Sequence, residues 1–132
     1  MIGLDTNVLI RYIVQDDPKQ AKRATRLIEK RCTQDEPGFV NHMVLCEIVW
    51  VLESVYRLAR GEVADILDRM LRVAVLEIED FDLALASLQL YRDGSCDFAD
   101  ALIGHRNRNH GCSATATFDR RAAQLAEFVA VP

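Results

Sequence analysis

The sequence lacks the features that mark a membrane, secreted or zinc-binding protein. No apolar stretch in its 132 residues is long enough to cross a bilayer. The N-terminus has no basic segment followed by a long apolar core, so we expect no signal peptide. The four cysteines, Cys32, Cys46, Cys96 and Cys112, form no C-x-x-C pair, which argues against a structural zinc site. We therefore expect a cytoplasmic protein with reduced thiols and no membrane partner.

The chain also lacks an excess of positive charge. Its net charge of −4 gives no general electrostatic footprint for nucleic acid, although acids that bind cations would weaken this argument. Half of the residues are hydrophobic and 27% are charged, which is typical of a globular domain with a substantial core. The length predicts a single domain over residues 1–132.

Strand-like and helical patterns alternate along the chain. We predict strands at Met1–Leu4, Phe39–Val40, Ala74–Ile78, Ser113–Thr117 and Phe128–Val131. Two helices have a predicted N-cap: Asp17 for a helix that begins at Pro18, and Asn41 for the helix Met43–Leu58. Further helices are predicted at Asn7–Val14, Gly61–Val73, Phe81–Tyr91, Phe98–Asn109 and Arg120–Leu125. Helices between strands imply an α/β fold with a parallel sheet covered on both faces.

Four acids stand in apolar segments, where an acid is unexpected. Asp5 follows the apolar run Ile2–Leu4, Glu47 interrupts an apolar helix, Asp100 lies within Phe98–Ile103 and Asp119 ends Thr115–Phe118. Burying an ionised carboxylate costs roughly several kcal/mol even after relaxation. Asp5 and Asp119 also follow predicted strands, and sites in parallel sheets form at the carboxyl ends of strands. We expect folding to gather the four acids around a positive group.

A divalent metal ion is the simplest such group. Two carboxylates about 5 Å apart repel by about 3 kcal/mol at an effective dielectric constant near 20. Mg²⁺ or Mn²⁺ would reverse the sign of this interaction, because both ions prefer carboxylate oxygens. Such ions lower the pKa of bound water and stabilise charge on a phosphoryl group under attack. The acids alone therefore suggest metal-assisted hydrolysis of phosphodiester bonds.

The same residues resemble a known family. The opening Met1–Ile10 is very similar to that of PIN-domain ribonucleases, especially the VapC-type toxins of type II toxin–antitoxin systems. The family's other motifs are matched, in order and spacing, by Glu47, by the segment Asp97–Ile103 and by the segment Thr115–Asp119. Each motif is weak by itself, but all of them in order within 132 residues are specific. The resemblance implies a three-layer sandwich with a central parallel sheet of about five strands.

The resemblance also implies a metal-dependent endoribonuclease. Asp5, Glu47, Asp100 and Asp119 match the catalytic, metal-binding acids. Asp97 lies one helical turn before Asp100, and it is either a further ligand or the N-cap of its helix. The fourth acid is the family's most variable, and Asp119 could instead cap the helix that follows it.

Other polar residues have supporting roles in the resemblance. Thr6 and Asn7 match the polar pair after the first acid, and Thr117 matches a hydroxyl residue that supports the site. Arg106, Arg108, Arg120 and Arg121 are candidates for contacts with RNA phosphates because they lie near two of the acids. A basic stripe on the second helix is either a solvated face or a track for the RNA backbone. His105 and His110 could be general acids, but they are more simply packed or exposed residues.

The expected partners are RNA, a cognate VapB-like antitoxin and a second copy of the chain. The helix Met43–Leu58 is apolar almost all round, which predicts burial on every side. Two alternatives remain: a non-toxin PIN-domain nuclease that processes RNA, and a catalytically inactive module that binds RNA or protein. A phosphoryl-accepting receiver domain does not fit, because it needs an acidic pair near its first strand and a late lysine, and no lysine follows Lys30.

Overall fold

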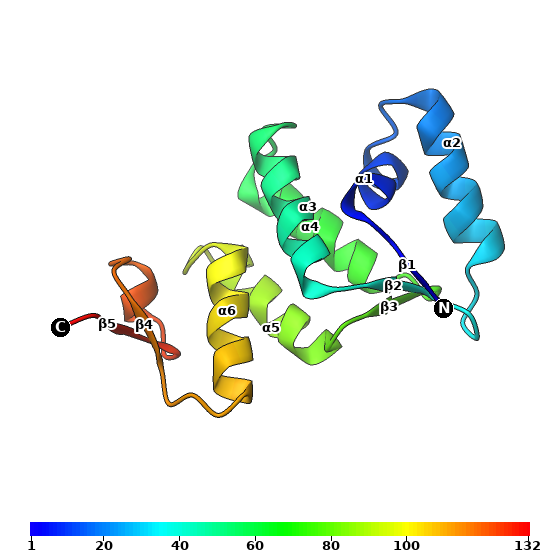
Figure 1. Cartoon of the computed structure of the whole chain (residues 1–132). Helices are drawn as coiled ribbons and strands as arrows, with labels where there is room; N and C mark the ends of the chain where they lie inside the picture. Colours follow the sequence, from blue (N-terminus) through cyan, green and yellow to red (C-terminus); the bar gives the residue numbers. More distant parts are fainter. The chain divides into compact units, whose positions relative to one another are not determined.

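The computed structural model describes residues 1–132 and divides the chain into two compact units, Met1–Glu79 and Asp80–Pro132 (Figure 1). Each unit is described by itself below, and the single-domain organisation stays a prediction. None of the helices combines the length and the apolar composition needed to span a bilayer. All four cysteines are free thiols, as predicted.

The first unit contains a three-stranded parallel sheet. Its strands are β1 (Ile2–Gly3), β2 (Gly38–Val40) and β3 (Leu76–Ile78), in the order β1-β2-β3. Gly3 pairs with Phe39, and Val40 pairs with Ile78. The connections are helical: α1 (Thr6–Val14), α2 (Pro18–Arg26) and the π-helical turn η1 (Leu27–Arg31), then α3 (His42–Ser54) and α4 (Arg60–Leu71). Parallel pairing confirms the α/β prediction, since parallel strands need such crossovers.

Two of the predicted helix caps are confirmed by hydrogen bonds. The Asp17 carboxylate accepts a hydrogen bond from the Gln20 amide, and the Asn41 side chain accepts one from the Val44 amide. α3 ends at Ser54 rather than Leu58. Val55 is the C-cap residue, and Arg57, three residues after the helix end, adopts a left-handed conformation with φ 54°.

The core of the first unit forms where α3 and α4 contribute apolar side chains. Leu45, Ile48 and Leu52 of α3 and Leu67 of α4 are fully buried. In the single chain α3 is not buried on every side, and the predicted burial of its remaining face by another chain stays a prediction. Met43 is 74% exposed and Trp50 is 63% exposed, because both lie on the outward face of the helix.

The second unit contains two helices and a pair of parallel strands. α5 (Phe81–Arg92) packs against α6 (Phe98–Asn109), and β4 (Thr115–Thr117) pairs with β5 (Phe128–Ala130). A short 3₁₀ turn, η2 (Ala122–Gln124), stands where a helix was predicted. Gly104 lets α6 approach β5 closely, because a Cβ at this position would lie 2.6 Å from the Phe128 ring.

The strands are not joined into one sheet of about five, as was predicted. The structure has five strands, but hydrogen bonding divides them into the sheet β1-β2-β3 and the pair β4-β5. Each strand has only two or three residues. The residue pattern identifies each strand by its own composition, whereas pairing depends on backbone positions that the pattern does not encode.

Candidate functional site

In the first unit, Thr6 links two of the predicted acids. The Thr6 amide donates a hydrogen bond to Asp5 Oδ1 at 2.7 Å, and its hydroxyl donates to Glu47 Oε1 at 3.1 Å. Asp5 follows the end of β1, Thr6 is the first residue of α1, and Glu47 lies on α3, 41 residues after Thr6. Thr6 is buried, so its position is fixed by packing. The fold thereby holds two carboxylates at one buried hydroxyl-bearing residue.

Each of these carboxylates keeps one oxygen without a hydrogen bond. Thr6 takes one oxygen of Asp5 and one of Glu47, and neither acid forms an ion pair with a lysine or arginine. Two anions linked in this way repel unless a cation lies beside them. Carboxylate oxygens are the ligands that Mg²⁺ and Mn²⁺ prefer, so the donor chemistry fits a divalent metal ion.

The burial expected of Asp5 and Glu47 from their apolar neighbours in sequence is wrong. Both residues are exposed, so neither pays the expected desolvation cost. Asp5 also has a local role that was not predicted, because it is the N-cap of α1 and its side chain accepts from the first helical amide. Asn7 is exposed on the first turn of the same helix and makes no hydrogen bond to either acid.

In the second unit, three acids act on one another. The pKa of the Asp100 carboxyl is raised, first by burial and then by the negative charges of Asp97 and Asp119. Asp100 is half-buried near the start of α6, and Asp97 is the N-cap residue of that helix. The Asp97 side chain makes no capping hydrogen bond to α6, so capping does not account for an acid here.

Asp119 lies two residues after β4 and organises the following turn. Its Oδ1 accepts hydrogen bonds from the amides of Arg121 at 2.8 Å and Ala122 at 2.9 Å. The Asp119 amide donates to the Thr117 hydroxyl at 3.0 Å, and the supporting role of Thr117 in the site stays a prediction. The element that follows is the 3₁₀ turn η2, whose N-cap residue is Arg121, so the choice between a ligand and a cap stays open for Asp119. The two amide contacts occupy one oxygen of the Asp119 carboxylate and leave the other without a hydrogen bond.

We predict that Asp100→Asn stabilises the metal-free protein at pH 7. Folding raises the pKa of Asp100 above its unfolded value of 3.8. The Asp100 carboxyl therefore contributes to stability below pH 3.8, and this contribution is lost as the pH rises through the folded pKa. Asparagine removes the charge that opposes folding. The melting temperature with chelator present should rise at pH 7, and the gain should shrink toward pH 4. Asp82→Asn, in the first turn of α5, removes one exposed acid and is the control for the change in net charge.

The four predicted arginine contacts have different environments. The Arg108 guanidinium pairs with Glu127, and Arg121 Nη2 donates to the Gly94 carbonyl at 2.6 Å. Arg120 is exposed and makes no ion pair, and Arg106 is exposed on α6. Contact with RNA phosphates stays a prediction for all four.

The three histidines have different environments. His105 Nδ1 shares a 3.0 Å hydrogen bond with the hydroxyl of the buried Ser87, which joins α6 to α5. His42 is buried at the start of α3, and its backbone amide donates to Glu79 at 2.8 Å. His110 is exposed after α6.

No group of three or more His, Cys, Asp and Glu side chains is arranged around a possible metal ion in the structure. The four-acid metal site therefore stays a prediction. Thr6 joins Asp5 to Glu47 in the first unit, and electrostatic repulsion couples Asp100 to Asp97 and Asp119 in the second.

Comparisons with known proteins identify a family for this chain. The PIN domain family matches residues 2–128. A curated relative, the VapC ribonuclease of Aquifex aeolicus (strain VF5), is 24% identical over 122 residues, which cover 92% of this chain and 90% of the relative. No solved structure matches the chain significantly.

Proposed function

Because this chain belongs to the PIN-domain family, we propose that it is a metal-dependent endoribonuclease that hydrolyses phosphodiester bonds of RNA. The observation that carries the proposal is the pairing of Asp5 and Glu47 through Thr6, with one oxygen of each acid left without a partner. The curated relative named as a ribonuclease supports the same activity.

We assign Asp5, Glu47, Asp100 and Asp119 as the catalytic, metal-binding acids, with Asp97 as a further candidate. A bound Mg²⁺ or Mn²⁺ would activate water and stabilise the charge that develops on the phosphoryl group. Thr6 would fix the orientation of the first two acids by holding one oxygen of each.

On the second unit, the proposed roles follow the local hydrogen bonds. Thr117 holds the backbone of Asp119, and Asp119 keeps one carboxylate oxygen for a ligand. Burial raises the pKa of Asp100 most, and the negative charges of Asp97 and Asp119 raise it further, so a cation would relieve part of the unfavourable energy of its charge. Asn7 and the arginines Arg106, Arg108, Arg120 and Arg121 are the proposed polar contacts for the RNA phosphates.

We further propose that the protein is the toxin of a toxin–antitoxin pair. The support is its similarity to the curated VapC ribonuclease and the VapC-like order of its acidic motifs. A VapB-like antitoxin in the cytoplasm would then inhibit it. Exposed Met43 and Trp50 on α3 are the surface that we assign to a second copy of the chain.

The activity can be tested with Asp5→Asn. Asparagine keeps the oxygen that caps α1 but removes the charge, so the variant should fold. Wild type, purified without a partner, should cleave RNA with Mg²⁺ or Mn²⁺ and lose activity with chelator, whereas Asp5→Asn should show no cleavage with either metal. The assay should include structured and unstructured RNA.

Two readouts make this test decisive. A thermal shift on adding metal should accompany cleavage by wild type and should be smaller in Asp5→Asn. If folded wild type neither cleaves RNA nor gains stability from Mg²⁺ or Mn²⁺, the metal-site proposal fails. A binding module would then be the better description.

A further inference from the structure

A basic groove runs along α2 and η1 of the first unit. Six of the chain's 16 lysine and arginine residues lie in Pro18–Arg31, including all three lysines, together with a single acid, Glu29. The whole chain carries a net charge of −4, so this segment is opposite in sign to the rest of the protein. A local charge of this kind can bind an anion that the average charge would repel.

The cations of this segment have no carboxylate partners. Arg23, Arg26, Lys30 and Arg31 are exposed, and none makes a hydrogen bond or an ion pair through its side chain. On an ordinary solvated helix, acids at neighbouring positions would neutralise some of them. The segment instead presents uncompensated positive charge.

These cations surround a hollow rather than a flat face. A hollow of about 620 Å³ is lined by Asn7 and Arg11 of α1 and by Arg23 and Leu27. A second hollow of about 550 Å³ begins at the same Arg23 and Leu27 and continues past the residues Arg26, Lys30 and Arg31. The shared residues make one groove, which we call the basic groove. Charges around a concave surface focus the electric field at an anion inside it.

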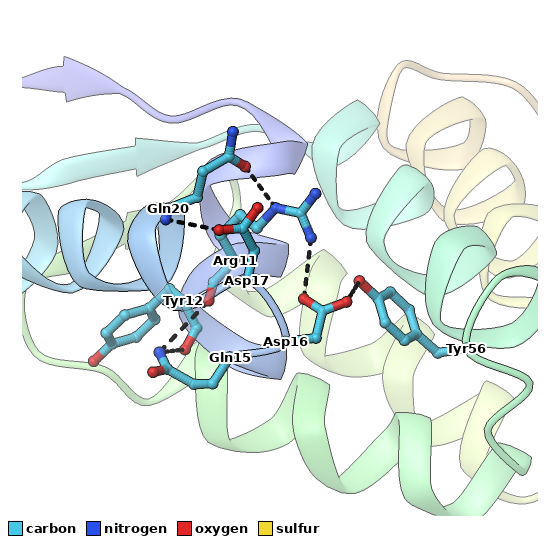
Figure 2. A network of polar contacts seen from close by, with 7 residues as sticks. All are labelled: Arg11, Tyr12, Gln15, Asp16, Asp17, Gln20 and Tyr56. Atoms are coloured by element: carbon cyan, nitrogen blue, oxygen red, sulfur yellow. Dashed lines mark hydrogen bonds and ion pairs between the residues drawn. The ribbon is translucent and has the colours of Figure 1, made fainter.

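One wall of the basic groove is held by a polar network (Figure 2). Arg11 Nε donates to Gln20 Oε1 at 2.7 Å, and Arg11 Nη1 donates to Asp16 Oδ1 at 3.0 Å. Tyr56, which follows α3, donates its hydroxyl proton to Asp16 Oδ2 at 2.9 Å. The Tyr56 hydrogen bond is the largest cause that lowers the pKa of Asp16, so Asp16 stays ionised and keeps Arg11 in place.

The other end of the network fixes α2 against α1. Figure 2 shows Gln20 beside both Arg11 and Asp17, and the Asp17 carboxylate accepts from the Gln20 amide. The small residues Ala21 and Ala24 are buried, which lets α2 pack closely. The groove is thus built before any ligand arrives, which lowers the entropic cost of binding.

The position of the groove relates it to the candidate acids. Asn7 lines its first hollow and lies two residues after Asp5 on the same helical turn. Arg23, Arg26 and Lys30 follow at helical spacing over about 10 Å. The apolar residues Val8, Ala24 and Leu27 lie between them, which suits the ribose and base faces of a nucleotide.

We propose that the basic groove binds the phosphodiester backbone of single-stranded RNA and leads it to Asp5. This inference rests on the proposed ribonuclease function, and it adds the path that the substrate takes. Phosphates on the strand would contact Arg23, Arg26, Lys30 and Arg31, while the riboses pack on the apolar floor. Binding of this kind depends little on sequence and strongly on salt.

The test compares two double variants with equal loss of charge. Arg26→Gln/Lys30→Gln removes two cations that line the groove, and Lys19→Gln/Lys22→Gln removes two exposed cations of α2 that do not. Both are made in a Glu47→Gln background, and binding of a labelled single-stranded oligoribonucleotide is measured by fluorescence anisotropy with chelator at several salt concentrations.

We expect the groove variant to bind RNA on the order of tenfold more weakly, with a salt slope smaller by about 1.4 for two lost contacts. The Lys19/Lys22 variant should bind almost as tightly as its parent. Equal weakening by both variants would mean general charge attraction, and no weakening by either would mean that RNA passes elsewhere. Either result overturns the proposal.

Two further measurements complete the test. The first distinguishes an acidic protein ligand from RNA, and the second distinguishes a failure of the groove inference from a failure of the proposed nuclease function. A polyglutamate peptide that displaces the RNA as well as unlabelled RNA does would assign the groove to an acidic protein segment instead. Metal-dependent cleavage by wild type is measured alongside. If wild type cleaves RNA but the groove variant binds normally, only the groove inference fails, whereas loss of cleavage in wild type contradicts the proposed function itself.

Discussion

Glu47→Gln is expected to lower metal-dependent cleavage by about 100-fold or more without unfolding the protein. Glutamine has nearly the same shape and keeps an oxygen for the Thr6 hydroxyl, but it removes the charge that would bind the metal. A metal ion contributes roughly several kcal/mol to the charge developing on the phosphoryl group, and each 1.4 kcal/mol is about tenfold in rate. Initial cleavage rates of both proteins, measured at saturating Mg²⁺ and Mn²⁺, provide the comparison.

The control for this variant is Glu77→Gln. Glu77 is an exposed acid on β3 that makes no hydrogen bond or ion pair, so its loss changes the net charge equally and should leave cleavage intact. Thr6→Val should lower the cleavage rate less than Glu47→Gln does, because it keeps both acids and removes only the hydroxyl that orients Glu47. We expect a loss of about 10- to 100-fold, which is the usual effect of removing a group that orients a metal ligand. Full activity in Glu47→Gln would exclude Glu47 as a ligand.

Phe98→Ala is expected to destabilise the protein by about 3–5 kcal/mol. Phe98 is the first residue of α6 and is 1% exposed, and its ring meets Tyr91 of α5 edge-on at 6.4 Å between centroids. Truncation leaves a cavity between the two helices and removes that aromatic contact. Urea unfolding followed by circular dichroism gives the free energy of unfolding.

The matched control is Ile103→Ala on the same helix. Ile103 is half-exposed, and its truncation should cost less than about 1 kcal/mol. Because Asp100 lies two residues after Phe98, a looser start of α6 should also reduce cleavage at temperatures where Phe98→Ala is still folded. Equal stability of the two variants would show that Phe98 does not anchor α6 to α5.

Local features were predictable from the sequence because they depend on neighbouring residues. Asp17 and Asn41 accept from the helix amides that their positions predict, and Asp5 and Asp119 both follow strands. Thr6 and Thr117 form hydrogen bonds with Asp5 and Asp119, which are close to them in sequence, and their supporting roles in a site stay predictions. The burial of Asp5 and Glu47 was misjudged, since apolar neighbours in sequence do not decide which face a side chain takes.

Contacts between distant segments came only with the fold. The bond from Thr6 to Glu47 spans 41 residues, and the network of Arg11, Asp16 and Tyr56 joins α1 to the end of α3. The cations of α2 were visible as a stripe, but the hollow around them depends on how α1 packs beside α2. Such contacts between distant segments depend on the closure of long loops and on side-chain packing, which residue patterns do not specify.

The sequence by itself determined the α/β class, the parallel strands and the helix caps at Asp17 and Asn41, because composition, periodicity and neighbouring residues encode them locally. The tertiary structure decided that Asp5 and Glu47 share Thr6, that Asp100 is raised in pKa by burial and by its acidic neighbours, and that the strands form two separate sheets. These features depend on distances between side chains that are far apart in the chain. Only the folded backbone sets those distances.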